Sequence, residues 1–164
     1  MNETEILTLV DRAFGASPRP EHFTNFDHCE ECAEHDELLR SRDRETLTLE
    51  DVGNAGWDPL SFTSSAGVAY YMPALVRLAL EAREPLGGLW YAGQLMTHFW
   101  HGGRYNKHLQ DFDVQQRQAV IAFAEFLINE RPQDSGPYAE DLLQVHDYWT
   151  AGPQESEQFP ESTA

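Results

Sequence analysis

Apolar side chains recur at intervals of three and four residues along most of this 164-residue chain. The interval matches the 3.6-residue turn of an α-helix, so each segment can bury one face against a neighbour. Strict alternation of apolar and polar residues, which is typical of half-buried strands, does not occur, and no segment repeats at a fixed period. The pattern predicts an all-α fold, built as a compact helical domain of about five to seven helices.

Capping residues indicate where these helices begin. Asn2 with Glu5, and Asp113 with Gln116, have the spacing of a capping box, in which each side chain bonds the other residue's backbone N–H. Thr63 can cap the helix of the densest apolar stretch, and Pro73 either kinks that helix or opens the next. The helices predicted from caps, periodicity and breakers span residues 3–14, 28–40, 63–80 (as one helix or as two that meet at Pro73), 89–101, 114–131 and 138–149.

The region between the second and third predicted helices is the least regular. Its segment TLTLEDVG predicts a short helix or turn, and GWDPLSF predicts a proline-containing loop. Trp57 and Phe62 are the large apolar side chains of that loop, so we expect them to hold it against the core.

Length and composition are those of one domain. A chain of 164 residues with 41% hydrophobic residues can fill a single core without a disulfide or an obligatory metal. The last residues, GPQESEQFPESTA, are polar and acidic and contain two prolines. We therefore expect a single helical domain over residues 1–151 and a disordered acidic tail over 152–164.

The charge balance excludes some classes of partner. Lys and Arg number 11 against 28 Asp and Glu, which gives a formal net charge of −17. Such a chain repels nucleic-acid phosphates and anionic membranes, so we expect neither as a direct partner. No stretch reaches the roughly 18 apolar residues of a membrane span, and no signal peptide is visible, so we expect a cytoplasmic protein. The acidity also suits an interaction or inhibitor protein that binds a basic protein surface.

Both cysteines lie in the segment HCEECAEH, residues 28–35. Two cysteines placed at random would show a CxxC spacing in only about one chain in a hundred. If the second helix begins at His28, with Asp27 and Glu30 as its cap, residues three apart share one face. Cys29, Cys32 and His35 would then form one stripe, while His28 would point elsewhere.

This stripe predicts a metal site of the zinc type. Zinc takes four ligands in a tetrahedron and accepts both thiolate and imidazole. Cys29, Cys32 and His35 supply three of them, and His98 or His101 of the segment THFWHGG could supply the fourth. Water or a neighbouring glutamate is an alternative fourth ligand. The role expected for such a site is stability or contact with a partner, in a protein that is not an enzyme.

Two alternatives stay open for the same residues. A CxxC pair at a helix start is also the arrangement of thiol–disulfide oxidoreductases, with Cys29 as nucleophile, Cys32 as resolving thiol and His35 as base. It resembles the CxxC of small helical peroxide-reducing proteins, although there three residues separate cysteine from histidine, and here only two do. The other alternative is a pair of inert, reduced thiols. The chain has no P-loop, GxGxxG, GxSxG or HExxH segment that would favour another enzyme class.

Three longer segments resemble a family of small bacterial proteins without an assigned activity. They read PRPEHFTNFDHCEECAEHDELL, EDVGNAGWDPLSF and AYYMPALVRLAL. The most specific parts are HCEECAEH, GWDP and YYMPALVRLAL, and the resemblance covers about residues 5–130. It implies a folded domain and no particular reaction.

Overall fold

The computed structural model describes residues 1–154, and helices account for about two thirds of them. The only β-pairings within these residues are two isolated bridges, Thr24 with Thr63 and Leu86 with Leu89. The predicted all-α fold is confirmed. This part of the chain has nine α-helices, slightly more than the five to seven predicted, because three of them have only four or five residues.

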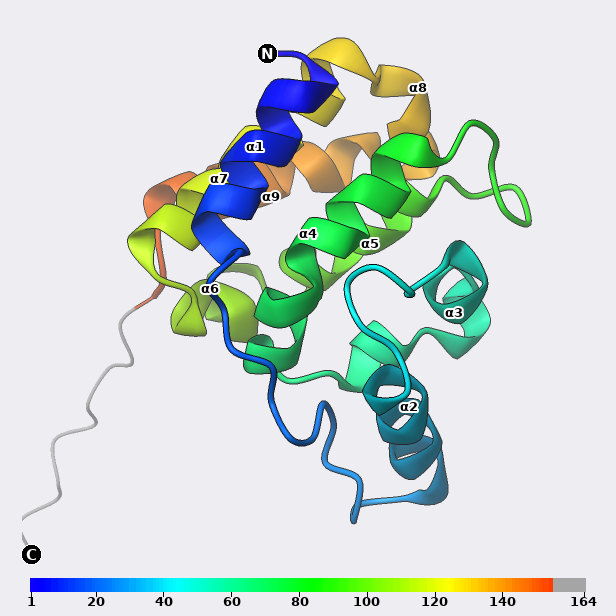
Figure 1. Ribbon diagram of the computed structural model, residues 1–164. Coiled ribbons are helices and arrows are strands. Elements are labelled where there is room, and N and C mark those ends of the chain that lie inside the picture. The colour runs from blue at the N-terminus through cyan, green and yellow to red at the C-terminus, as the bar shows by residue number, and fades with distance from the viewer. Residues whose placement is uncertain (155–164) are drawn as a thin grey trace, which may run out of the picture.

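The helices follow one another along the chain as drawn in Figure 1. The α-helices are α1 (Glu3–Phe14), α2 (Glu30–Arg40), α3 (Leu49–Val52), α4 (Ser65–Glu81), α5 (Tyr91–Trp100), α6 (Lys107–Asp111), α7 (Val114–Glu130), α8 (Pro132–Ser135) and α9 (Ala139–Ala151). Four short 3-10 helices separate them: η1 (Ala55–Trp57), η2 (Pro59–Phe62), η3 (Gly103–Tyr105) and η4 (Gly136–Tyr138).

The core lies among the five long helices other than α2. Helix α1 packs on α4 and α7, and α9 packs on α7 and α5, so these helices enclose one continuous set of buried apolar side chains. Aromatic rings fill its centre, with Phe99 edge-on to Trp149 at a centroid distance of 5.4 Å. The indole N–H of Trp149 donates to the backbone oxygen of Phe99 at 2.8 Å, so this buried polar atom is satisfied.

Both predicted capping boxes are present, at the starts of α1 and α7. Of the two alternatives at Pro73, the start of a new helix is wrong, because Pro73 lies inside α4, which continues from Ser65 to Glu81 as one helix. Its buried residues occur on several sides, so packing holds the helix together across the proline. Ser64 is the N-cap in place of Thr63, whose hydroxyl instead donates to the backbone oxygen of Pro59 at 2.8 Å.

Helix α2 lies with η2 and α3 beside this body, at the lower right of Figure 1. The buried phenol of Tyr71 on α4 donates to the backbone oxygens of Leu39 and Arg42, at 2.6 and 2.9 Å. One turn earlier in α2, the buried Asp36 accepts the backbone N–H groups of Phe23 and Thr24. These bonds fix α2 between the connector that precedes it and helix α4.

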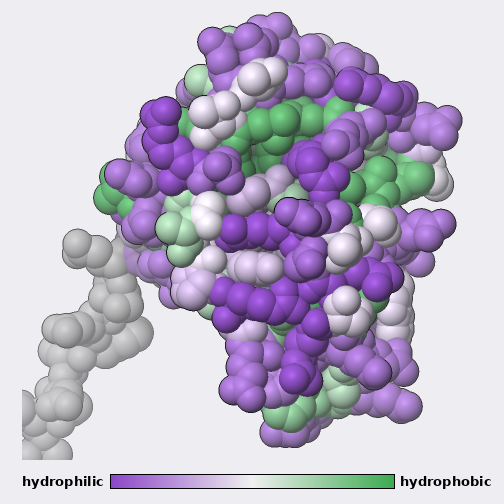
Figure 2. Space-filling view, viewed as in Figure 1, coloured by the Kyte–Doolittle hydropathy of each residue, from purple (hydrophilic) through white to green (hydrophobic). Residues whose placement is uncertain are grey.

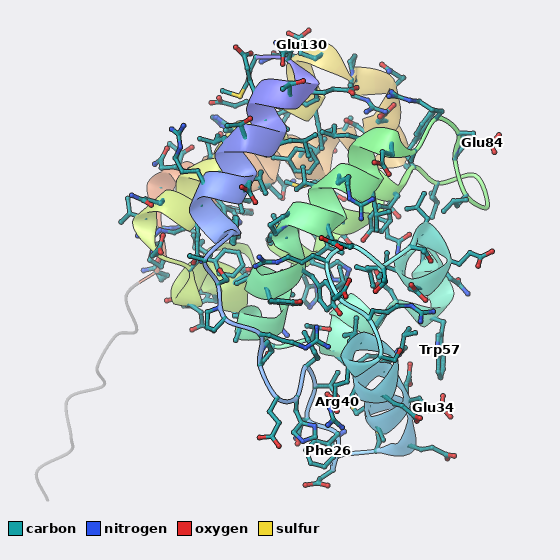
Figure 3. All side chains as sticks on the ribbon, in the orientation of Figure 1. Phe26, Glu34, Arg40, Trp57, Glu84 and Glu130 are labelled. Atoms are coloured by element: carbon teal, nitrogen blue, oxygen red, sulfur yellow. The ribbon has the colours of Figure 1, made fainter. Side chains whose placement is uncertain are left out.

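The surface of this projecting part is mostly hydrophilic in the view of Figure 2. Trp57 and Phe62 were expected to pin the GWDP loop to the core, and this expectation is wrong, because their exposed fractions are 45% and 37%. Figure 3 shows Trp57 at the outer edge of the molecule. Both rings pack instead against the imidazole of His35.

The end of the described chain is held by η3. Arg104 donates to the backbone oxygen of Gly152 at 2.9 Å, and the N–H of Gln154 donates back to the oxygen of Arg104 at 3.1 Å. Most of the predicted disordered tail, residues 155–164, lies outside the described residues. None of the helices in residues 1–154 is both long enough and apolar enough to cross a bilayer.

Candidate functional site

The CxxC segment forms the start of α2, but the helix begins two residues later than predicted. Its first residue is Glu30, and Cys29 is the N-cap, with extended backbone angles φ −160° and ψ 168°. The sulfur of Cys29 accepts the backbone N–H of Cys32 at 3.3 Å. A thiol thus takes the place that Ser, Thr, Asp or Asn usually has, and the Asp27–Glu30 pair does not cap the helix.

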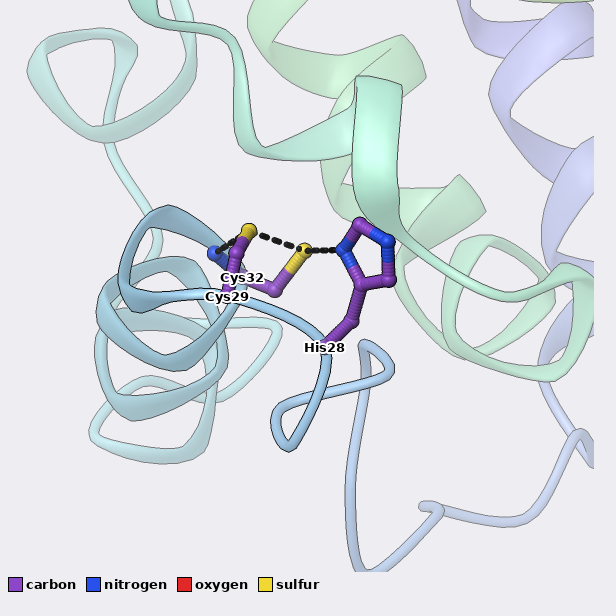
Figure 4. Close-up of side chains that lie close together, drawn as sticks. All are labelled: His28, Cys29 and Cys32. Atoms are coloured by element: carbon purple, nitrogen blue, oxygen red, sulfur yellow. Dashed lines mark hydrogen bonds between the residues drawn. The ribbon is translucent and has the colours of Figure 1, made fainter.

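Three donor atoms meet at this helix start (Figure 4). The sulfur atoms of Cys29 and Cys32 are 3.1 Å apart, and Nδ1 of His28 lies 3.7 Å from the sulfur of Cys32. All three atoms lie within 4.8 Å of one another. The expectation that His28 points elsewhere is therefore wrong. It assumed a helix at His28, whereas the extended backbone at Cys29 turns the imidazole towards Cys32.

The two thiols differ in exposure and in acidity. Cys29 is exposed, whereas Cys32 is only 4% exposed. The hydrogen bond with the Cys32 side chain, assisted by the Cys32 backbone N–H and by His28, lowers the pKa of Cys29 to about 7. The same side-chain contact, together with burial, raises the pKa of Cys32. At neutral pH a thiolate therefore forms on the exposed sulfur first.

His35 lies on α2 but does not belong to this donor group. Its ring is 1% exposed and packs against Phe62 and Trp57, at centroid distances of 5.3 and 4.8 Å. Nε2 lies 3.5 Å from a carboxylate oxygen of Glu31 and has no hydrogen-bond partner within residues 1–154. The structure thus brings His28 to the cysteines and places His35 in an aromatic contact.

His98 and His101 also lie apart from the cysteines. Nε2 of His98 is 2.8 Å from Asp58, the aspartate of the GWDP segment, and His101 is the exposed C-cap of α5. Asp58 accepts two more hydrogen bonds, from the side chain of Gln94 and the backbone N–H of Leu60. Neither histidine is among the donor atoms that meet at the start of α2 in the described part of the chain.

The donor group has the chemistry of a soft metal site. Two thiolates bound to one tetrahedral zinc at about 2.3 Å lie about 3.8 Å apart, and a thiolate and an imidazole nitrogen lie about 3.6 Å apart. The distance from His28 to Cys32, 3.7 Å, already fits, while the two sulfurs at 3.1 Å must separate slightly. Cys29 is exposed, so its side chain has room to rotate. The group could therefore hold a metal ion.

Nearby charges favour a cation at this position. Four acidic residues lie next to the cysteines in the sequence: Asp27, Glu30, Glu31 and Glu34. They oppose two uncompensated thiolates, whereas a divalent ion neutralises the thiolates and is attracted by the carboxylates. The positive end of the α2 dipole supports a single thiolate at Cys29 but is weaker than a bound ion.

The fold and the site together define an all-α protein with a Cys/Cys/His donor group at a helix N-terminus. Residues 2–152 match the model of a family of unknown function, DUF6714, and the chain belongs to that family. The expected membership in an uncharacterised domain family is thereby confirmed. Neither the comparison with curated proteins nor that with solved structures finds a match.

Proposed function

We propose that the protein binds a zinc-type metal ion through Nδ1 of His28 and the sulfurs of Cys29 and Cys32. The observation that carries the proposal is the meeting of these three donor atoms within 4.8 Å of one another. Thiolate and imidazole are the ligand types that zinc prefers, and three protein ligands leave one coordination position open. In this proposal His28 takes the place first assigned to His35, and no ligand from α5 is needed.

The open position faces solvent, because His28 and Cys29 are both exposed. A water molecule can fill it, or a side chain of another protein can. The ion would join the residue before the N-cap, the N-cap itself and the first turn of α2, so it would hold the chain reversal at the start of this helix. The proposed role is a local structural one, with the open position available for contact with a partner.

The test is the metal content of untagged protein purified without chelator, measured by inductively coupled plasma mass spectrometry beside a count of free thiols. We expect close to one zinc per chain and two protected thiols. A His28→Ala variant should lose affinity for zinc in competition with a colorimetric chelator. A His101→Ala variant is the matched control and should bind as the wild type does. Metal-free protein with two freely reacting thiols, which also fails to take up added zinc, contradicts the proposal.

A second candidate, thiol–disulfide exchange, is favoured by the unequal exposure of the two sulfurs at 3.1 Å. The Cys29 thiolate would attack a disulfide of another protein, forming a mixed disulfide and releasing one thiolate. The Cys32 sulfur would then attack Cys29, form the Cys29–Cys32 disulfide and release the second thiolate. The substrate gains two electrons and the CxxC pair loses them, while the imidazole of His28 accepts the proton of Cys32.

A trapping experiment separates the two candidates. In a Cys32→Ser variant the mixed disulfide on Cys29 cannot be resolved, so exchange predicts a covalent adduct with a reporter disulfide that persists until a reductant is added. The control is Cys29→Ser, which should form no adduct because its remaining thiol is buried. A wild-type protein that neither reduces the reporter nor reaches a defined equilibrium with glutathione contradicts exchange.

A further inference from the structure

A pocket of about 650 Å³ opens beside η2. It lies between η2, the C-terminal half of α5, the turn η3, the start of α6 and the start of α9. A volume of this size is typical of small-molecule sites. Its walls combine the aromatic rings of Trp100, Tyr105 and Tyr138 with polar groups. None of the residues proposed to bind metal lines it, so the two sites are independent.

His98 presents a defined nitrogen in this pocket. The carboxylate of Asp58 can only accept hydrogen bonds, so the contact with Nε2 of His98 requires a proton on that nitrogen. Nδ1 of the neutral ring is then a hydrogen-bond acceptor, and it has no partner among residues 1–154. Asp58 is 6% exposed and is held by Gln94 and Leu60, so it fixes the orientation of the ring as a positioning residue.

His108 contributes no charge to the pocket at neutral pH. It is 1% exposed, its Nδ1 lies 3.0 Å from the hydroxyl of Ser65, and burial lowers its pKa to about 3. The carboxylate of Asp58 is buried and already accepts hydrogen bonds from His98, Gln94 and Leu60, so it is not available to a ligand. Recognition of a charged ligand therefore depends on other lining residues.

Lys107 and Asp141 supply one charge of each sign, from α6 and α9. The ammonium group of Lys107 donates one hydrogen bond, to the backbone oxygen of Thr63 at 2.7 Å, which leaves two N–H groups. Neither Lys107 nor Asp141 forms an ion pair within residues 1–154. One positive and one negative side chain beside aromatic walls favour a ligand that also carries both charges.

The charge of the whole chain disfavours an anionic ligand, and Lys107 in the lining disfavours a simple cation. At a formal net charge of −17 the protein repels a simple anion, and a single lysine offers limited compensation. A zwitterion has no net charge to repel, and each of its ends can pair with one lining residue. We propose that the pocket binds a small zwitterion of the amino-acid class. Its carboxylate would contact Lys107, and its ammonium group would contact Asp141. A polar hydrogen of the ligand would bond to Nδ1 of His98.

The experiment is an NMR titration of the ¹⁵N-labelled full-length chain with L-serine through the millimolar range, following the backbone amides of η3 and α6. We expect saturable shifts confined to the pocket. N-acetyl-L-serine lacks the ammonium charge and L-serinamide lacks the carboxylate, so each should bind at least roughly tenfold more weakly. No saturable shift with serine, or equal affinity for all three compounds, overturns the proposal.

Two variants keep the test specific to the lining charges. Asp141→Asn removes one charge with almost no change of shape, and Lys107→Met keeps the apolar stem of the side chain. Each should weaken serine binding by at least roughly tenfold while the spectrum of the core is unchanged. A Cys29→Ser chain should bind serine as the wild type does, because that residue does not line the pocket. Unchanged binding by both pocket variants would rule the proposal out.

Discussion

The sulfur of Cys29 lies 3.1 Å from the sulfur of Cys32 and accepts the backbone N–H of the same residue at 3.3 Å. Both contacts lower the pKa of Cys29, and the sulfur–sulfur contact raises the pKa of Cys32. The capping of α2 and the reactivity of its thiols therefore depend on the same few atoms. Any change at Cys32 should alter the chemistry of Cys29 without touching it directly.

The first prediction concerns the alkylation of Cys29 in metal-free protein. Alkylation requires the thiolate, and the pKa of Cys29 is lowered to about 7. The rate of iodoacetamide labelling at Cys29 should therefore rise through a midpoint near pH 7, well below that of an ordinary thiol at about 8.5. Cys32, which is buried with a raised pKa, should react more slowly at every pH. Peptide mapping after timed labelling distinguishes the two sites.

A pair of substitutions at Cys32 controls this experiment. Cys32→Ala removes the side-chain hydrogen bond, the largest cause of the lowered pKa, so the midpoint of Cys29 labelling should move to higher pH. Cys32→Ser keeps a donor of similar size and should move it less. A midpoint that is the same in all three proteins would show that the sulfur contact has no influence on Cys29.

The second prediction concerns thermal stability and zinc. An ion bound only by the folded chain stabilises it by about 2.7 kcal/mol when free zinc is a hundred times Kd. For a chain of this size that corresponds to a rise in Tm of about 5–10 °C. The rise should be reversed by a chelator and should be much smaller in His28→Ala. Differential scanning calorimetry of both proteins, with and without zinc, measures it. A wild-type Tm that ignores zinc and chelator alike would contradict the metal site.

Local signals in the sequence predicted much of this architecture. The capping boxes Asn2–Glu5 and Asp113–Gln116 were found where predicted, because a cap depends only on residues three apart. The predicted start of α2 is two residues too early. Asp27 and Glu30 have the spacing of a cap, whereas the actual cap is Cys29, and cysteine is not a usual capping residue. That error of two residues also misplaced His28, whose direction depends on whether the backbone before Cys29 is helical. Recognising Cys29 as the N-cap was the one signal that could have revealed the third donor.

The partners of the more distant histidines could not be predicted in this way. Whether His98 meets a cysteine or Asp58 depends on which loop packs beside α5, and no spacing along the chain contains that information. The same holds for His35, which is buried by Trp57 and Phe62 from a loop expected to turn inward. Contacts between segments far apart in sequence are set by the packing of the whole molecule.

The third prediction concerns Asp58, which connects η2 to α5. Asp58→Ala leaves the buried N–H of His98 and one N–H of Gln94 without an acceptor and removes the cap of η2. Because an unsatisfied buried donor costs about 1–3 kcal/mol, the free energy of unfolding should fall by about 2–4 kcal/mol. Urea denaturation measures the change. Asp111→Ala, at an exposed carboxylate, should stay within about 0.5 kcal/mol of the wild type. Equal effects in the two variants would contradict the assigned role of Asp58.

The last prediction is the pH dependence of stability that follows from His108. Its pKa is about 3 in the folded chain, chiefly because of burial, against an ordinary value of 6.5 in the unfolded chain. Between these values the unfolded chain holds one more proton than the folded chain, so the free energy of unfolding decreases as the pH falls. The decrease due to this residue approaches about 1.4 kcal/mol per pH unit below pH 6. Carboxylates with lowered pKa, such as Asp36 and Asp51, add to it only when the pH nears about 4.

Urea unfolding at intervals from pH 6.5 to pH 4.5 measures this slope. The His108→Gln side chain cannot take up a proton, so the slope of the unfolding free energy against pH should fall by up to about 1.4 kcal/mol per pH unit, the contribution of one proton. Only the slopes are compared, so a loss of stability caused by the substitution itself does not affect the result. His101→Gln, at an exposed position, is the matched control and should keep the wild-type slope. If His108→Gln has the same slope as the wild type, the imidazole is not held neutral, and it would then add positive charge to the pocket beside Lys107.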